Sequence, residues 1–189
     1  EAWQAVLDKH KASASKIENR VHEEIYRQTV EDQNNKRITP FVEPNYEGNV
    51  PTRRFGVEQA TSDGRSKIRC IDDCHDSSLN SATNIVGRIR MGRIRDVLRI
   101  AKRLHRAFPS KNLVFWKTDF KSAYRSVPIR VAHRHLAKIV VWDCEAGCSR
   151  VAQHMAMPFG ATSAVYAWDR LAHALCHVIR FYTQAGFSR

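Results

Sequence analysis

The sequence predicts an α+β fold in which long amphipathic helices accompany a small sheet. Apolar residues recur at helical spacing over 93–107 and 162–184, so both stretches are expected to form helices. Residues 136–143 read as a strand, Gly147 as a turn, and residues 149–155 as the returning strand of a β-hairpin. Long helices, one hairpin and scattered strands together indicate the class α+β.

The first part of the chain is expected to be a helix followed by loops and one short strand. Residues 2–33 read as a helix because apolar residues recur every four positions, at Ile17, Val21 and Ile25. This helix is either an exposed element that packs on little or a functional arm. Residues 38–66 are rich in proline and glycine and are expected to be loop. Residues 67–71 are a strand candidate, and 77–80 read as a turn leading into a helix.

The helix expected over 93–107 is apolar on one side and strongly basic on the other. Its apolar stripe comprises Ile94, Val97, Leu98, Ala101 and Leu104. Eight cations lie on or beside it against a single acid, Asp96: Arg88, Arg90, Arg93, Arg95, Arg99, Lys102, Arg103 and Arg106. A solvated charged face is the ordinary interpretation. The lack of acidic partners nevertheless favours phosphate contacts, with Arg95, Arg99, Lys102 and Arg106 as candidates.

Composition narrows the classes of partner. The net charge of +12 indicates a polyanion, and nucleic acid leads because its binding releases counterions; a merely soluble basic protein is the alternative. No apolar run approaches the roughly 20 residues of a membrane helix, so no membrane partner is expected. The five cysteines, without a secretion signal, indicate reduced thiols. Two Cys-x-x-x-Cys pairs leave a zinc site conceivable, although ordinary thiols are favoured.

Two further segments carry candidate chemistry. Residues 113–118 read as a strand that ends at Asp119, and Tyr124 follows five positions later. A carboxylate oxygen is a hard ligand for Mg²⁺, which also binds the phosphates of a nucleotide, and an aromatic ring can press on the sugar. Residues 157–163, Met-Pro-Phe-Gly-Ala-Thr-Ser, read as a turn in which Gly160 lets a backbone approach a base pair closely.

Together these segments resemble the polymerase core of a reverse transcriptase, an RNA-directed DNA polymerase. Residues 119–124 resemble the family's first metal-binding motif, Asp-x-x-x-Ala-Tyr/Phe, and residues 157–160 resemble its template-gripping motif. Residues 67–80, with Lys67-Ile-Arg69, Asp72 and Asn80, resemble the fingers segment whose cations hold the incoming triphosphate. The three matches occur in the family's order and cover about residues 50–185.

The resemblance implies a partial right-hand polymerase within residues 39–189, preceded by a separate helical segment over 1–38. Fingers material would span about 50–105 and 130–155. Palm material would span about 106–129 and 156–189.

The resemblance also implies roles for single residues. Asp119 would bind both Mg²⁺ ions in the intact enzyme, with the carbonyl of Phe120 as an additional ligand. Tyr124 corresponds to the aromatic that excludes a ribose 2′-hydroxyl and so selects deoxynucleoside triphosphates. Lys67 and Arg69 would grip the triphosphate.

The remaining implied contacts concern the template-primer, which is RNA or DNA. Phe159 stands where some reverse transcriptases carry glutamine and would pack near the sugar. Gly160 would allow close approach to the templating pair. Asp72 and Asp73 are expected to orient the triphosphate-binding cations or to cap the following turn.

One family motif is absent from the sequence. The Tyr-x-Asp-Asp hairpin, which supplies the other catalytic carboxylates, should follow the helix after Gly160, yet the only Asp-Asp pair is Asp72-Asp73. We therefore expect a fragment that binds Mg²⁺ weakly or not at all and does not polymerise alone. The alternative is a non-catalytic, nucleic-acid-binding remnant of a retroelement. A viral RNA-copying polymerase is disfavoured because Tyr124 stands where that family has a second acid.

Overall fold

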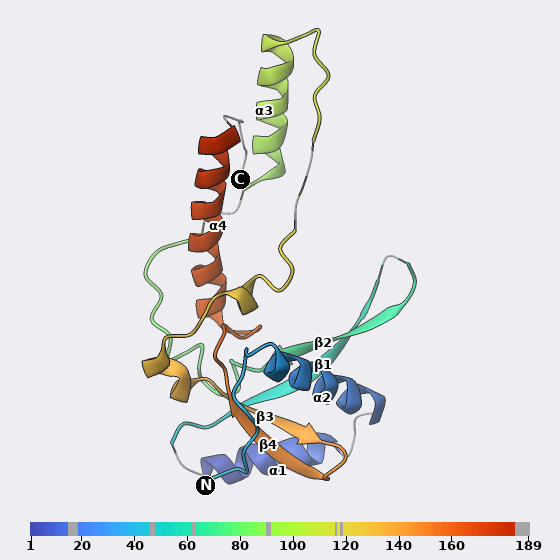
Figure 1. Ribbon diagram of the computed structural model, residues 1–189, viewed down its shortest axis with the longest axis vertical. Helices are drawn as coiled ribbons and strands as arrows, with labels where there is room; N and C mark the ends of the chain where they lie inside the picture. Colours follow the sequence, from blue (N-terminus) through green and yellow to red (C-terminus); the bar gives the residue numbers. More distant parts are fainter. Residues whose placement is uncertain are drawn as a thin grey trace.

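A computed structural model of the chain describes residues 1–14, 19–45, 48–61, 63–89, 92–115, 117 and 119–183. A four-stranded sheet lies at one end of the molecule, and two helices extend away from it (Figure 1). The strand order is β2-β1-β3-β4. The expected α+β class is therefore confirmed.

Two hairpins build the sheet. β1 (Thr52–Ala60) pairs antiparallel with β2 (Ser66–Asp72), and β3 (Lys138–Asp143) pairs antiparallel with β4 (Cys148–Gln153). The hairpins join through a short parallel contact between β1 and β3, in which Thr52 lies beside Ile139. The hairpin expected over 136–155 is confirmed, and Gly147 adopts the positive φ of 62° that its turn needs.

The two N-terminal helices cover opposite faces of this sheet. α1 (Ala2–Ala14) packs Trp3 and Leu7 against Val140 and Val151, which point from one face. α2 (Asn19–Asn34) packs on the other face, where it contacts β1, β2 and β3. Both faces can be covered because alternate residues of a strand point to opposite sides of the sheet. A Cβ added to Gly56 of β1 would lie 2.9 Å from Val21 of α2, so the helix lies directly on the strand. The helices are thus part of the core, whereas the sequence left open an exposed element or an arm.

A separate core cluster links the sheet to the C-terminal half. It contains Cys74, Ala161 and Ala164, with Leu79, Tyr124 and Met157 packed against them. α4 (Thr162–Thr183) starts here and extends away from the sheet. Two short 3₁₀ helices, η1 (Tyr124–Ser126) and η2 (Val131–Leu136), precede β3. α3 (Ile94–Ala107) lies at the end of the molecule away from the sheet, and none of its residues is buried. No helix within the described ranges is long and apolar enough to cross a membrane.

Three expectations about local structure were wrong. The strand expected over 113–118 is irregular at residues 113–115 and 117, and Trp116 and Thr118 lie outside the described residues. Val114 is 83% exposed, and the described chain supplies no neighbouring strand for this segment, so its backbone has nothing to pair with. β1 lies within the region expected to be loop. The helix expected after residue 80 is absent from residues 81–89.

Candidate functional site

Three segments with candidate chemistry, far apart in sequence, converge where β2 ends and α4 begins. The backbone N–H of Asp72 donates a hydrogen bond to the carbonyl of Phe159 over 2.9 Å. Asn80 donates from Nδ2 to the carbonyl of Gly160 over 3.1 Å, and its Oδ1 accepts from the N–H of Thr162 at 2.8 Å. The side chain of Tyr124 packs against the core cluster that contains Cys74, Ala161 and Ala164. The fold thus brings the end of β2, the ring of Tyr124 and the turn of residues 159–162 to one place, whereas no contact joins Asp119 to them in the described chain.

Gly160 is required by its contact with Asp72. Its φ is 126°, and an added Cβ would lie 2.1 Å from the carbonyl oxygen of Asp72. No L side chain fits at that distance without moving the backbone. The close approach that Gly160 permits is therefore an intramolecular one, and the sequence did not indicate its partner.

The aromatic residues of the site form two pairs. The rings of Tyr124 and Phe159 lie 5.8 Å apart at an angle of 40°. Phe120 meets Trp168 of α4 edge-on, with centroids 5.2 Å apart. Such tilted and edge-on contacts are favourable for aromatic rings. Phe120 and Phe159 remain 45% and 39% exposed, so each leaves part of its ring open to a ligand.

Asp119 is exposed and lies in an irregular segment rather than at the end of a strand. The following turn contains Ser122 at a φ of 57°, a left-handed conformation that is uncommon for serine. No group of three or more metal-ligating side chains occurs within the part of the chain that the structure describes. Asp119 and the Phe120 carbonyl would supply two of the roughly six oxygens that Mg²⁺ takes. This donor set fits only part of an Mg²⁺ site.

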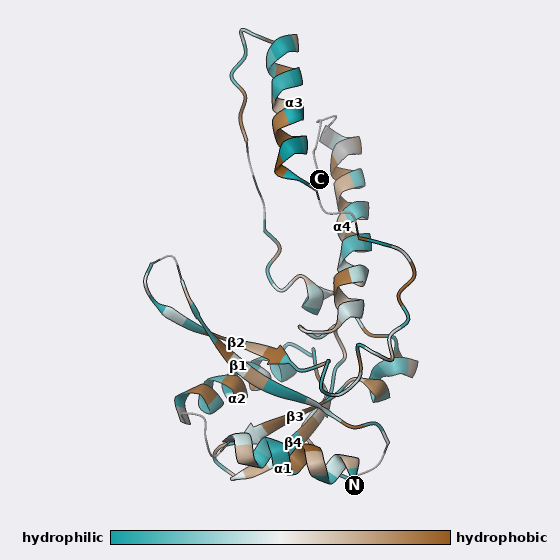
Figure 2. Ribbon diagram, turned by 180° about the vertical axis from the view of Figure 1, so that it is seen from behind, coloured by the Kyte–Doolittle hydropathy of each residue, from teal (hydrophilic) through white to brown (hydrophobic). Residues whose placement is uncertain are grey.

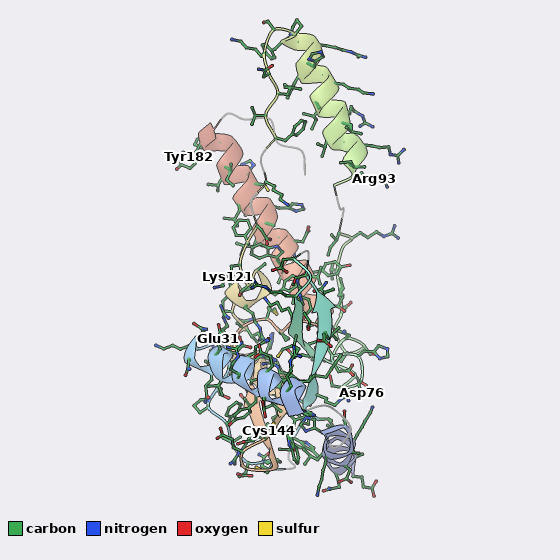
Figure 3. All side chains as sticks on the ribbon, turned by 90° about the vertical axis from the view of Figure 1, so that its right-hand side faces the viewer. Glu31, Asp76, Arg93, Lys121, Cys144 and Tyr182 are labelled. Atoms are coloured by element: carbon green, nitrogen blue, oxygen red, sulfur yellow. The ribbon has the colours of Figure 1, made fainter. Side chains whose placement is uncertain are left out.

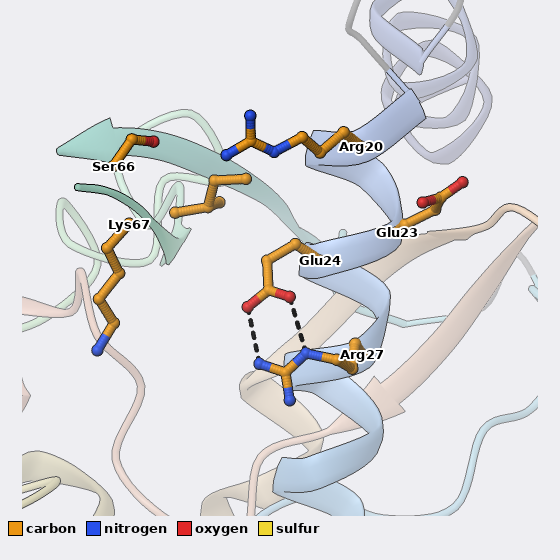
Figure 4. A pocket seen from close by; sticks show the side chains of 7 residues that line it. Arg20, Glu23, Glu24, Arg27, Ser66 and Lys67 are labelled. Atoms are coloured by element: carbon orange, nitrogen blue, oxygen red, sulfur yellow. Dashed lines mark hydrogen bonds and ion pairs between the residues drawn. The ribbon is translucent and has the colours of Figure 1, made fainter. Parts of the chain in front are cut away.

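Lys67 and Arg69 lie on the face of β2 that points away from Ile68 and Cys70, and both are exposed. At about 3.3 Å per residue, Arg69 lies about 10 Å and Lys67 about 16 Å along the strand from Asp72. Lys67 also lines an open groove of about 550 Å³ between β2 and α2, across from Glu24 and Arg27, which form an ion pair (Figure 4). The two cations therefore lie on the protruding ribbon rather than against the convergence point.

No known family model matches the chain. No curated protein matches it either. The reverse-transcriptase resemblance therefore stays a hypothesis based on the sequence motifs.

A buried charge cluster lies directly behind the convergence point, and the sequence did not predict it. Asp72 accepts two hydrogen bonds from Arg54, at 2.7 Å from Nε and 3.2 Å from Nη2. Arg125 lies 2.9 Å from Asp32 of α2 and 3.6 Å from Asp72. Nε2 of His154 lies 3.2 Å from Asp72. Asp72, Arg54 and His154 are almost completely buried, and Asp32 and Arg125 nearly so.

The charge states of this cluster follow from burial and pairing. Burial alone would raise the pKa of Asp72, but Arg54 and His154 hold it far below its usual range. Burial lowers the pKa of His154 to about 4, against the opposing effect of Asp72. Nη1 of Arg125 lies 2.9 Å from Nδ1 of His154, so Nδ1 is the acceptor and the ring is neutral. Burial also lowers the pKa of Arg125, with Arg54 adding to the effect.

Asp72 and Asp73 therefore differ in role. Asp72 was expected to orient Lys67 and Arg69 or to cap a turn, whereas it binds Arg54 and faces the interior. Asp73 does cap the turn, since its Oδ1 accepts a hydrogen bond from the N–H of Asp76 over 3.0 Å. β2 ends at Asp72, and Asp73 begins the turn after it, where its carboxylate also lies 3.3 Å from Arg53.

α3 presents both of its faces to solvent. Figure 2 shows hydrophilic and hydrophobic residues on different sides of the helix, and Figure 3 shows its side chains projecting into open space. The candidate phosphate contacts are all exposed: Arg95, Arg99, Lys102 and Arg106. Ile94 and Leu98 on the apolar stripe are also 72% and 53% exposed. Arg90, one of the eight cations counted in the sequence, lies outside the described residues.

Proposed function

We propose that this chain is the fingers-and-palm part of a reverse transcriptase, which adds deoxynucleotides to a primer paired with an RNA or DNA template. The observation that supports the proposal most is the convergence of Asp72, Tyr124 and Gly160. These residues belong to three motifs that occur in the family's order, and nothing in their sequence spacing requires them to meet. Hydrogen bonds from Asp72 and Asn80 fix the turn that carries Phe159 and Gly160.

In this proposal Tyr124 controls the sugar of the incoming nucleotide. Its ring packs on Phe159 on one side and on the core around Cys74 on another, so it has little freedom to move. A ring held in this way excludes a 2′-hydroxyl by its volume, and steric exclusion needs a rigid wall. The exposed Arg69 and Lys67 of β2 supply positive charge for a triphosphate.

Asp119 is the proposed catalytic carboxylate. It is accessible to solvent, and with the Phe120 carbonyl it provides part of the oxygen set for Mg²⁺. The metal, when bound, neutralises the phosphates during phosphoryl transfer. Asp119 would hold and orient it, while Phe120 packs on Trp168 and so anchors this segment to α4.

The test is primer extension with Mg²⁺ and deoxynucleoside triphosphates. The 189-residue chain should give no extension, whereas a longer chain from the same gene that includes a Tyr-x-Asp-Asp hairpin should extend. Asp119→Asn in the longer chain should abolish extension because the mutant loses the carboxylate charge that holds the metal. Asp8→Asn, an exposed acid on α1, is the matched control and should leave extension intact. Equal extension by the Asp119→Asn variant would remove Asp119 from the mechanism.

A second candidate function, nucleic-acid binding without catalysis, is favoured by α3. Its cations are exposed, and the described residues include one ion pair on this helix, Arg99 with Asp96 at 3.5 Å. Exposed arginines with few acidic neighbours attract phosphates at any sequence. Binding of a template-primer by the 189-residue chain, combined with no extension by the longer chain, would support this function instead.

A further inference from the structure

The turn that carries Tyr124 has little stability of its own. η1 is a single 3₁₀ turn closed by hydrogen bonds from Ser126 to Ala123 (3.2 Å) and from Val127 to Tyr124 (3.1 Å). Short 3₁₀ turns have poor hydrogen-bond geometry, and the segment before this one is irregular and exposed. The backbone of the turn therefore needs a restraint besides the packing of the Tyr124 ring on Phe159 and the core.

Arg125, the next residue, supplies that anchor. Its guanidinium reaches into the buried charge cluster, where Asp32 lies 2.9 Å and His154 Nδ1 2.9 Å away. The side chain is 12% exposed, so most of its hydrogen bonding comes from these partners rather than from water. Because Tyr124 and Arg125 are consecutive, fixing one side chain in the interior limits where the other can point.

Asp72 connects the same anchor to the opposite aromatic ring. Its carboxylate lies 3.6 Å from Arg125, while its backbone N–H holds the carbonyl of Phe159 at 2.9 Å. Asp72 thus contacts both the side chain of Arg125, next to Tyr124 in the sequence, and the backbone of Phe159. Besides their direct contact, the two rings are therefore joined by a path of interactions through the buried cluster.

Asp32 balances the charge of this path. Three arginines lie within ion-pair distance of it: Arg125 at 2.9 Å, Arg54 at 3.2 Å and Arg37 at 3.4 Å. In the described cluster, these three cations face two carboxylates, Asp32 and Asp72, beside a neutral histidine. Without Asp32, the three arginines would have only the carboxylate of Asp72 in this cluster. Buried cations that lack partners move apart or draw in water.

We propose that Asp32 and Arg125 are positioning residues for Tyr124, so that the N-terminal helix α2 sets the selection of deoxynucleotides over ribonucleotides. The inference depends on the proposed function for its consequence in selectivity. Its structural part, that α2 fixes the Tyr124 turn through Asp32, stands independently of any activity.

The first experiment uses the 189-residue chain and measures amide hydrogen exchange. Asp32→Asn should speed exchange at Ser126 and Val127 by at least about ten-fold, while amides of β3 remain protected. The matched control is Glu31→Gln on the same helix, where an exposed acid lies 3.5 Å from Arg27, and it should leave the turn unchanged. Unchanged exchange in Asp32→Asn would overturn the inference.

A second variant covers the case in which Asp32→Asn fails to fold. The double variant Asp32→Asn/Arg125→Gln removes one negative and one positive charge, so no excess cation is created. It should fold, with β3 protected, yet still show fast exchange at Ser126 and Val127 because the anchor is gone. Slow exchange at the turn of this folded double variant would show that the pair does not position Tyr124.

The second experiment measures the preference for deoxynucleoside over ribonucleoside triphosphates in the longer, polymerase-competent chain. The preference should fall about ten-fold in Asp32→Asn and in the double variant, and remain unchanged in Glu31→Gln. A ratio of two rates does not depend on how much protein is folded, so a purely structural role would leave it unmoved. An unchanged ratio in an active enzyme would refute the selectivity role. A wild-type chain that extends no primer would refute the proposed function, and the exchange experiment would still decide whether α2 positions the turn.

Discussion

Gly160→Ala should break the contact that joins the first hairpin to the turn before α4. An alanine Cβ at this position would lie 2.1 Å from the carbonyl oxygen of Asp72. Carbon and oxygen ordinarily touch at about 3.3 Å, so the two backbones must separate by about 1 Å. The residue also has a φ of 126°, which an L side chain rarely adopts.

Two costs add up in this variant. The backbone conformation costs about 1–3 kcal/mol for a residue other than glycine. Separation of the backbones weakens the hydrogen bonds from Asp72 to Phe159 and from Asn80 to Gly160, each worth about 1 kcal/mol. We expect the free energy of unfolding to fall by about 3–5 kcal/mol in total.

Gly147→Ala is the matched control. Gly147 also has a positive φ, 62°, but nothing lies within 4 Å of its added Cβ. Only the conformational cost remains, about 1–2 kcal/mol. Urea unfolding followed by circular dichroism measures both variants. If Gly160→Ala loses no more stability than Gly147→Ala, the contact with Asp72 does not constrain the glycine.

Three further predictions concern pH, selectivity and salt. Burial lowers the pKa of His10 to about 4 from 6.5, so between these pH values the unfolded chain binds more protons than the folded chain, and the free energy of unfolding falls as the pH falls. His10→Gln should remove up to about 3 kcal/mol of this loss between pH 6.5 and 4. An unchanged pH dependence of unfolding in the variant would argue against this. Tyr124→Val in the longer chain should admit ribonucleotides more readily, and an unaltered preference in competition assays would leave Tyr124 as a packing residue. Reversing Arg95, Arg99, Lys102 and Arg106 to glutamate should flatten the plot of log affinity for DNA against log salt by roughly one unit per lost phosphate contact; the same slope in fluorescence anisotropy would place the binding surface elsewhere.

The elements that the sequence predicted well are those with a strong local pattern. β3 and β4 contain runs of apolar residues on either side of a glycine turn. In α4, apolar residues recur at helical spacing over 22 residues. β1 was missed because its sequence, Thr-Arg-Arg-Phe-Gly-Val-Glu-Gln-Ala, contains arginine where a buried strand normally has an apolar residue. Arg54 is only 2% exposed, and its burial makes sense only once Asp72 and Asp32 are seen beside it.

Three residues of the convergence point could be named from the sequence, but their connections could not. Tyr124, Phe159 and Gly160 were named from their motifs, and the structure brings them together. The charge cluster joins residues from α2, β1, β2, η1 and the segment after β4. No local pattern pairs residues separated by such distances, because the pairing depends on strand order and register. The strand expected before Asp119 was wrong for a related reason: apolar composition cannot form a strand without a neighbouring strand to pair with.

The short parallel contact between β1 and β3 has a consequence for how the chain folds. Each hairpin is local and can form within about 1–10 μs, but their junction joins Thr52 to Ile139 through only two residue pairs. Closing so long a loop for so few contacts is slow, so docking of the hairpins should limit the folding rate. During synthesis Asp32, Arg54 and Asp72 leave the ribosome well before Arg125 and His154. Arg54 can pair with Asp32 and Asp72 within the first half, but Arg125 and His154 can join these charges only once the second half has been made.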